Sequence, residues 1–135
     1  MNKEKRKRYS ERWEIISATI RIDRAKNRCE KCSAVHGSII KRLSGSSFRL
    51  ATAEELKAVD NYKKVHKTKL LSTLKNFRLI QVALNVAHLN HIETDDRPIN
   101  LLCMCQRCHL MHDRQDNRMR QKKVSISQLI IPALD

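Results

Sequence analysis

"VAHLNHIETDDRPINLLCMCQRCHLMHD", residues 86–113, contains four of the chain's six histidines and three of its five cysteines. Both residue types bind metals, and histidine also titrates near neutral pH. Upstream of the polar loop in this stretch, residues 77–88 alternate between apolar and polar side chains, which is typical of a strand with one buried face. Beyond the loop, residues 99–104 form a short extended piece, and no glycine or proline interrupts a helix from Gln106 to about Lys122. The stretch therefore predicts a strand, a loop, a second strand and a helix.

The cysteines are spaced as metal ligands. Cys29 and Cys32 form one C-x-x-C pair, Cys105 and Cys108 form another, and 72 residues separate the two pairs. Four thiolates complete a tetrahedral zinc shell, and the second pair lies at a helix start, whose dipole favours thiolate. The sequence predicts one structural Zn²⁺ that ties the N-terminal helix to the C-terminal strands and helix. Cys103 is expected to be a buried free thiol.

Composition and charge narrow the class of protein. The 135 residues fit one domain, and an aromatic content of 4% with two glycines and two prolines favours a helix-rich α+β fold over an all-β fold. A net charge of +14, with basic runs at residues 3–8, 63–69 and 114–123, indicates a polyanionic partner, and nucleic acid fits best. No apolar stretch is long enough to cross a membrane, and a membrane-surface helix would need an aromatic-rich apolar face. The N-terminus lacks the apolar core of a secretory signal, so a cytoplasmic location is expected.

Local signals place further elements upstream. A helix is predicted from Ser10 to about Lys26, with Trp13 in the core. The segments "SIIKRL" and "SFRLA" flank "SGS", which predicts a short β-hairpin. Thr52 and Glu55 form a capping box, so a helix should begin there and continue into the sixties.

Three of these segments, "CEKC", "LNVAHLNH" and "INLLCMCQRCHLMHD", resemble the HNH endonuclease family, in particular small phage and prophage proteins with an "AHLNH" core. The resemblance covers residues 13–36 and 82–113, roughly half of the chain. It implies a ββα-metal fold in which His88 is the general base and Asn100 is the middle residue of the motif. His109 would be the last histidine and a ligand of the catalytic metal.

The residues suit the chemistry that the resemblance implies. Phosphodiester hydrolysis needs a base to deprotonate water, and a histidine with a pKa near 6.5 is suited to that task at neutral pH. A divalent cation must also stabilise charge on the scissile phosphate and on the leaving 3′ oxygen. Asn100, which does not titrate, can hold the loop by hydrogen bonds and so orient the imidazole of His88.

One departure from the family pattern concerns the metal ligands. HNH proteins commonly place Asp or His directly before the base, but Ala87 stands there and cannot bind a metal. His109 and Asp113 lie one helical turn apart on one face, so together they are expected to hold two coordination positions. The candidates for the third ligand are His91, which is the first choice, Asp95 and Asp96. An imidazole in place of a carboxylate would shift the preference from Mg²⁺ towards Mn²⁺, Ni²⁺ or Co²⁺.

We thus interpret the protein as a metal-dependent DNA endonuclease that acts in the cytoplasm of a bacterial host cell. Residues 1–9 would be a basic disordered arm. Residues 10–123 would form the HNH domain, which has its ββα core at about 77–123 and an extra helical insertion. Residues 124–135 would be a tail that docks back on the core. The expected DNA contacts are Lys5, Arg6, Lys7, Arg8, Arg114, Arg118 and Arg120.

Other interpretations remain open. If no loop residue replaces the missing ligand at Ala87, the chain is a non-catalytic zinc-containing nucleic-acid-binding protein on the same fold. A zinc-ribbon-like RNA-binding module is a further alternative, but a surface poor in aromatic residues suits it badly. The oligomeric state is open as well: the protein could act as a monomer or be assisted by another phage or host protein.

Overall fold

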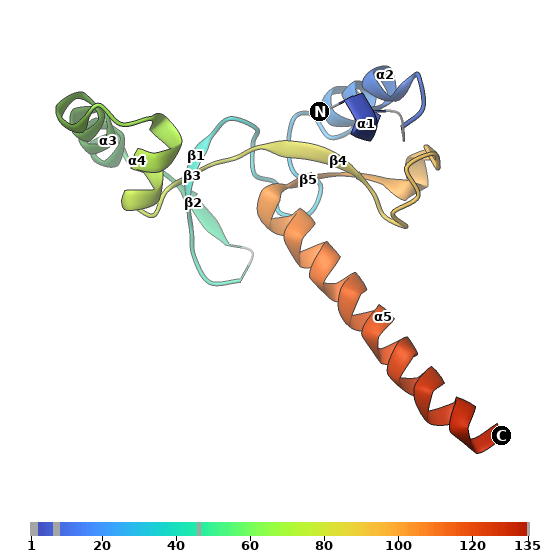
Figure 1. Ribbon diagram of the computed structural model, residues 1–135. Coiled ribbons are helices and arrows are strands. Elements are labelled where there is room, and N and C mark those ends of the chain that lie inside the picture. Colours follow the sequence, from blue (N-terminus) through green and yellow to red (C-terminus); the bar gives the residue numbers. More distant parts are fainter. Residues whose placement is uncertain (1–2, 7–8, 46, 135) are drawn as a thin grey trace.

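The computed structural model describes residues 3–6, 9–45 and 47–134, while the side chains of residues 5–6 and 122–134 lie outside this description. Helices and small antiparallel sheets form an α+β fold, as predicted (Figure 1). One sheet has three strands in the order β2-β1-β3, and the other consists of β4 and β5. No helix in the described part of the chain is both long and apolar enough to cross a membrane.

The quoted stretch forms a hairpin followed by a helix, which confirms the predicted order of elements. β4 (Leu84–His88) pairs antiparallel with β5 (Leu101–Cys105), so that Leu84 lies opposite Cys105 and His88 lies opposite Leu101. The loop between the strands ends in a short 3-10 helix, η2 (Pro98–Asn100), and α5 (Gln106–Leu134) follows β5 without a break. We call β4, β5 and α5 the hairpin–helix unit.

The single strand predicted at residues 77–88 is divided between the two sheets. β3 (Ile80–Gln81) pairs with β1, whereas β4 pairs with β5. Between the two strands, Val82 is buried and exchanges backbone hydrogen bonds with Gly37 and Ser38. The alternating pattern reported the buried face of this extended segment correctly, but it carries no information about which strand pairs with which.

The C-terminal tail continues α5 instead of docking back on the core, so that prediction was wrong. The backbone of α5 is helical from Gln106 to Leu134, and the helix projects away from the rest of the molecule (Figure 1). The physical reason lies in the sequence, because no glycine interrupts residues 106–134 and the one proline stands near the helix end.

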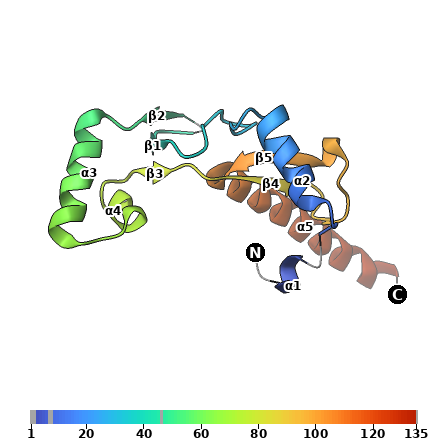
Figure 2. The same cartoon turned by 90° about the horizontal axis from the view of Figure 1, so that it is seen from above.

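The N-terminal helix lies across the hairpin–helix unit (Figure 2). α2 (Trp13–Ala18) runs directly into a π-helical segment, η1 (Thr19–Arg24), and Trp13 and Ile20 are buried, which confirms the core position of Trp13. Where a disordered arm was expected, α1 (Lys3–Arg6) forms one helical turn. The remaining basic residues of that arm, Lys7 and Arg8, lie outside the described residues.

Residues 37–81 form an inserted lobe with a small core of its own. It contains β1 (Ile39–Arg42), β2 (Phe48–Leu50), α3 (Ala53–His66), α4 (Leu70–Asn76) and β3. The predicted hairpin and the capping box are both confirmed: the Thr52 hydroxyl accepts a hydrogen bond from Glu55 N, and the Glu55 carboxylate accepts one from Thr52 N. α4 was not predicted, since no side chain caps its N-terminus. Val59, Leu74 and Leu79 form the buried centre of the lobe, separate from the main core.

Candidate metal centre and histidine site

The two C-x-x-C pairs meet in one cluster. The Sγ atoms of Cys29, Cys32, Cys105 and Cys108 all lie within 4.8 Å of one another, and none of the four is in a disulfide. The 3.6 Å between Cys32 Sγ and Cys105 Sγ is close to the roughly 3.8 Å that a tetrahedral shell with Zn–S bonds of about 2.3 Å requires. Within the residues that the structure describes, this is the one group of three or more potential ligands that converges in this way. The cluster is therefore suited to hold zinc.

Local backbone geometry arranges the first pair. Ser33 N donates to Cys29 O (2.9 Å), Cys29 N donates to Ala34 O (2.8 Å), and Ser33 adopts a left-handed conformation with φ of 70°. These bonds form a tight knuckle that turns both thiols inward. Glu30 N donates to Cys103 O (2.8 Å), so the knuckle is fastened directly to β5 and the two cysteine pairs are brought together.

The electrostatics of the cluster favour binding of a cation. Burial and the neighbouring thiols raise the pKa of Cys108, because several thiolates in one buried cluster would repel each other. A bound zinc ion removes this difficulty, since it holds its thiolates deprotonated. Cys103 stays outside the cluster: burial, and then the nearby Glu30 carboxylate, raise the pKa of its thiol to about 11. It is a buried neutral thiol, as predicted.

Arg42 adds a positive charge beside the cluster, which no local motif predicts. Its Nη2 lies 3.0 Å from Cys105 Sγ, and its Nη1 lies 3.6 Å from Cys32 Sγ. Burial on its own would lower the pKa of Arg42, but the contacts with the two thiols outweigh burial and raise it. The guanidinium also lies 5.6 Å above the ring centre of Phe48. Because Arg42 belongs to β1, it couples the inserted lobe to the cysteine cluster.

His88 ends β4 in an enclosed position beside a carboxylate. Its side chain is 4% exposed, and its Nε2 lies 2.9 Å from Asp96 Oδ1. The ring stacks on Trp13 with 4.6 Å between ring centres, and Tyr9 lies on Trp13 in turn at 5.1 Å. When Nε2–H donates to Asp96, Nδ1 is left as a hydrogen-bond acceptor. The imidazole is thus oriented by one carboxylate and one aromatic ring.

Asn100 fastens the loop between β4 and β5. Its Nδ2 donates to Asn90 Oδ1 (2.9 Å) and to Asp95 O (2.8 Å), and its Oδ1 accepts from Asn90 N (3.1 Å). The loop is fixed again where Arg97 pairs with the Asp95 carboxylate at 2.7 Å and so holds the pKa of that carboxyl well below its usual range. The loop-holding hydrogen bonds predicted for Asn100 are therefore present.

The predicted ligands of a catalytic cation come together only in part. His109 Nε2 lies 3.6 Å from Asp113 Oδ2, and Asp113 Oδ1 is buried with no hydrogen-bond partner among the described residues. His91 instead pairs with Asp116 further along α5, at 2.6 Å, and its ring lies beside His112 with 5.9 Å between ring centres. An unpartnered buried carboxylate oxygen beside an imidazole suits a bound cation. His91 as the third ligand stays a prediction.

A cavity of about 500 Å³ adjoins His109. It lies between α2 and β4 and is lined by Trp13, Arg21, Asn85 and His109 among others. Arg21 Nε is buried without a hydrogen-bond partner in the described part of the chain. Of the two predicted catalytic histidines, His109 lines the cavity, whereas His88 does not and only stacks on Trp13, which does.

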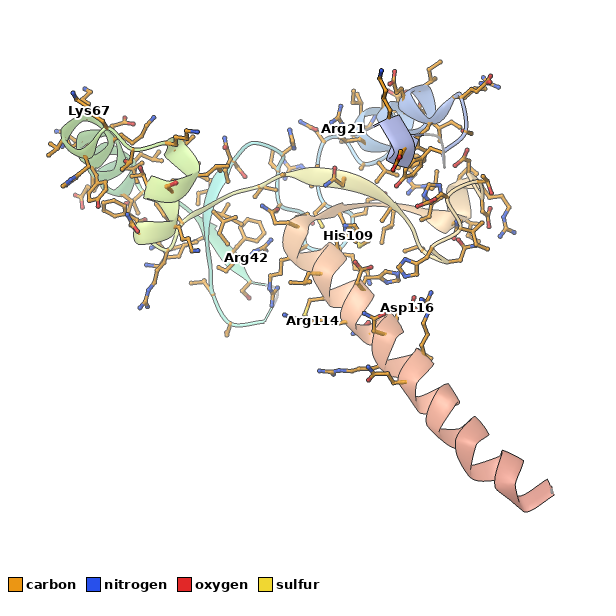
Figure 3. The ribbon with its side chains drawn as sticks, viewed as in Figure 1. Arg21, Arg42, Lys67, His109, Arg114 and Asp116 are labelled. Atoms are coloured by element: carbon orange, nitrogen blue, oxygen red, sulfur yellow. The ribbon has the colours of Figure 1, made fainter. Side chains whose placement is uncertain are left out.

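The predicted DNA contacts can be located only on α5. Arg114 and Arg118 are exposed, and Arg120 Nη2 lies 3.4 Å from Asp116 Oδ2. Figure 3 shows Arg114 and Asp116 on α5. The side chains of Lys5, Arg6, Lys7 and Arg8 lie outside the described residues.

Comparisons of the chain with protein-family models, with curated proteins and with solved structures find no match. What the fold and the site define together is a small α+β protein with a four-cysteine cluster suited to zinc. The adjoining hairpin presents an imidazole held by a carboxylate.

Proposed function

We propose that the protein is a metal-dependent DNA endonuclease of the HNH type, which hydrolyses phosphodiester bonds with His88 as the general base. The observation that carries the proposal is the placement of three side chains on the hairpin–helix unit. His88 ends the first strand, Asn100 fastens the connecting loop, and His109 stands within the first turns of the helix that follows. We read this unit as a ββα-metal core.

The zinc ion would have a structural role. The four cysteines would hold it, joining the knuckle after η1 to the junction between β5 and α5. Structural zinc sites stabilise small domains by on the order of 10 kcal/mol or more, which is large against the stability of a chain with two small cores. The ion would therefore fix the strand and the helix that carry the histidines.

The geometry of His88 fits general-base chemistry. With Nε2–H directed at Asp96, Nδ1 accepts the proton of the attacking water as its oxygen bonds to phosphorus and the 3′ oxygen leaves. The Asp96 carboxylate then stabilises the imidazolium. In the same site His109 and Asp113 would hold the divalent cation, with His91 as the third ligand, and the cation when bound stabilises negative charge on the phosphate.

Plasmid relaxation tests the proposal directly. Purified protein incubated with supercoiled plasmid should nick or cleave it in Mg²⁺, Mn²⁺, Ni²⁺ or Co²⁺ and should leave it intact without divalent ions. His88→Ala should lower the rate by a factor of roughly 10² to 10⁴ with zinc content and DNA affinity unchanged. His66→Ala is the matched control, because His66 is an exposed histidine of α3 in the inserted lobe. Full activity in His88→Ala would exclude the mechanism.

A non-catalytic zinc-containing nucleic-acid-binding protein is the second candidate. Two observations favour it: Ala87 offers no ligand, and His91 is paired with Asp116. Measuring nicking against metal concentration separates the two functions. For a nuclease, His91→Ala should weaken metal activation, while Ala87→Asp should increase activity in Mg²⁺, provided that the melting temperature shows both variants folded. Absence of nicking by the unmodified protein in all four ions would establish the second candidate.

A further inference from the structure

A second cavity, of about 560 Å³, lies where the inserted lobe meets the start of α5. Its walls come from the end of β1, from α4 and the turn after it, from β3, and from Gln106 at the first position of α5. Gln106 fixes this junction, because its Nε2 donates to Gln81 O (2.9 Å) and its Oε1 accepts from Ala83 N (3.1 Å). The cavity thus lies between two parts of the chain that are tied together.

Four of the residues that line this cavity are basic, namely Lys41, Arg42, Lys75 and Arg78, and the others are mainly apolar. As far as the described residues define the lining, no acidic side chain is among them. Arg42 is engaged with the cysteine thiols, but no ion pair or side-chain hydrogen bond among the described residues involves the other three. Lys75 and Arg78 are exposed, and basic side chains gathered around one hollow without an acidic partner attract an anion.

The backbone at Arg78 offers a way to remove this side chain without disturbing the fold. α4 ends in a Schellman motif, in which Leu79 N donates to Leu74 O (2.9 Å) and Arg78 N donates to Lys75 O (3.1 Å). Arg78 occupies the left-handed position of the motif, with φ of 57°, where glycine is strongly preferred. Glycine can therefore replace Arg78 without backbone strain.

From these observations we propose that the cavity binds a backbone phosphate of DNA, at a point outside the histidine site. The proposal rests on the proposed function, since it names the nucleic-acid substrate as the source of the phosphate. Arg78 and Lys75 donate to the phosphate oxygens, and Lys41 adds a third positive charge at the wall. The site fixes the position of the duplex on the inserted lobe and reads no bases.

The experiment uses the glycine preference at two equivalent positions. Lys67 also adopts a left-handed conformation, with φ of 50°, at the end of α3, and it lies at the outer end of the inserted lobe, away from Arg42 and the start of α5 (Figure 3). Arg78→Gly and Lys67→Gly therefore remove one positive charge and one strained residue each. Both variants should melt at the same temperature as the parent or higher, because glycine relieves the backbone.

Affinity for a short fluorescent duplex is measured by anisotropy on zinc-loaded protein without other divalent ions. Arg78→Gly should weaken binding about tenfold near 0.1 M salt and lower the slope of log affinity against log salt by about one. Lys67→Gly should change affinity about twofold at most. Lys75→Gln, compared with Lys64→Gln on α3, gives a second matched pair with the same expected contrast.

Equal losses in Arg78→Gly and Lys67→Gly would overturn the proposal, and so would a parent protein that fails to bind the duplex. Calorimetric titration with inorganic phosphate tests whether the cavity binds free phosphate instead of DNA. If Arg78→Gly abolishes phosphate binding but leaves duplex affinity unchanged, the proposed DNA contact is wrong. Because affinity is measured without catalytic ions, it is separate from nicking. A protein that shows the contrast in affinity but never nicks plasmid would contradict the proposed nuclease and leave the phosphate site standing.

Discussion

Replacing Arg42 by methionine should loosen zinc without unfolding the protein. Methionine retains an apolar stem against Phe48 but removes the guanidinium, whose two nitrogens lie 3.0 Å and 3.6 Å from the sulfurs of Cys105 and Cys32. Groups that bind the metal ligands from outside the coordination shell typically contribute 10- to 100-fold to metal affinity. One short and one long contact place Arg42 near the middle of this range, so the zinc dissociation constant should rise about 30-fold, or about 2 kcal/mol.

The measurement is competition for zinc between the protein and a chromophoric chelator. Arg49→Met is the matched control, since it removes an arginine from the neighbouring strand β2 and breaks an ion pair with Glu55 without touching a cysteine. It should leave zinc affinity unchanged. The zinc affinity of Arg42→Lys should lie between those of the two methionine variants, because lysine keeps a positive charge but lacks the planar guanidinium. Equal zinc affinity in Arg42→Met and Arg49→Met would refute the coupling between the inserted lobe and the metal centre.

Three further predictions concern the inserted lobe. Leu74→Ala removes a side chain that is 1% exposed and should cost about 2–5 kcal/mol in denaturant unfolding; a loss below 1 kcal/mol would mean that the lobe core hardly contributes. Thr52→Ala breaks the capping box and should cost about 1 kcal/mol, whereas Thr52→Asn should cost less if capping is the cause. The hydrogen bonds from Arg49, and then those from Thr52, lower the pKa of Glu55 from 4.5 to about 2. The stability from this pair is therefore complete above about pH 4.5 and should be lost as the pH falls towards 2, and Arg49→Met should flatten that part of the unfolding curve.

Local sequence signals predicted the features that depend on neighbouring residues. A capping box requires only residues three apart, and it begins α3 at the expected place. Two C-x-x-C pairs are typical of metal ligands, and their thiols do converge. Alternation before the loop and an uninterrupted helical stretch after it gave β4 and α5 in the correct order.

Contacts between distant segments could not be predicted in the same way. Arg42 lies 63 positions from Cys105, and a basic residue in a predicted hairpin looks like any exposed cation until the fold brings it to the thiols. The pairing of His91 with Asp116 depends on the path of the loop over α5, which spacing along the chain does not determine. The same holds for Asp96, which was weighed as a metal ligand and lies against His88 instead.

One zinc ion bound by Cys29, Cys32, Cys105 and Cys108 would hold together the elements that carry the histidines. Native mass spectrometry of the purified protein, with circular dichroism on the same sample, tests it most directly. We expect one zinc per folded chain, and we expect Cys105→Ser to lose both the zinc and most of its helical signal. A Cys103→Ser control should keep the zinc, since Cys103 stands outside the cluster. Well-folded protein that contains no zinc would contradict the account.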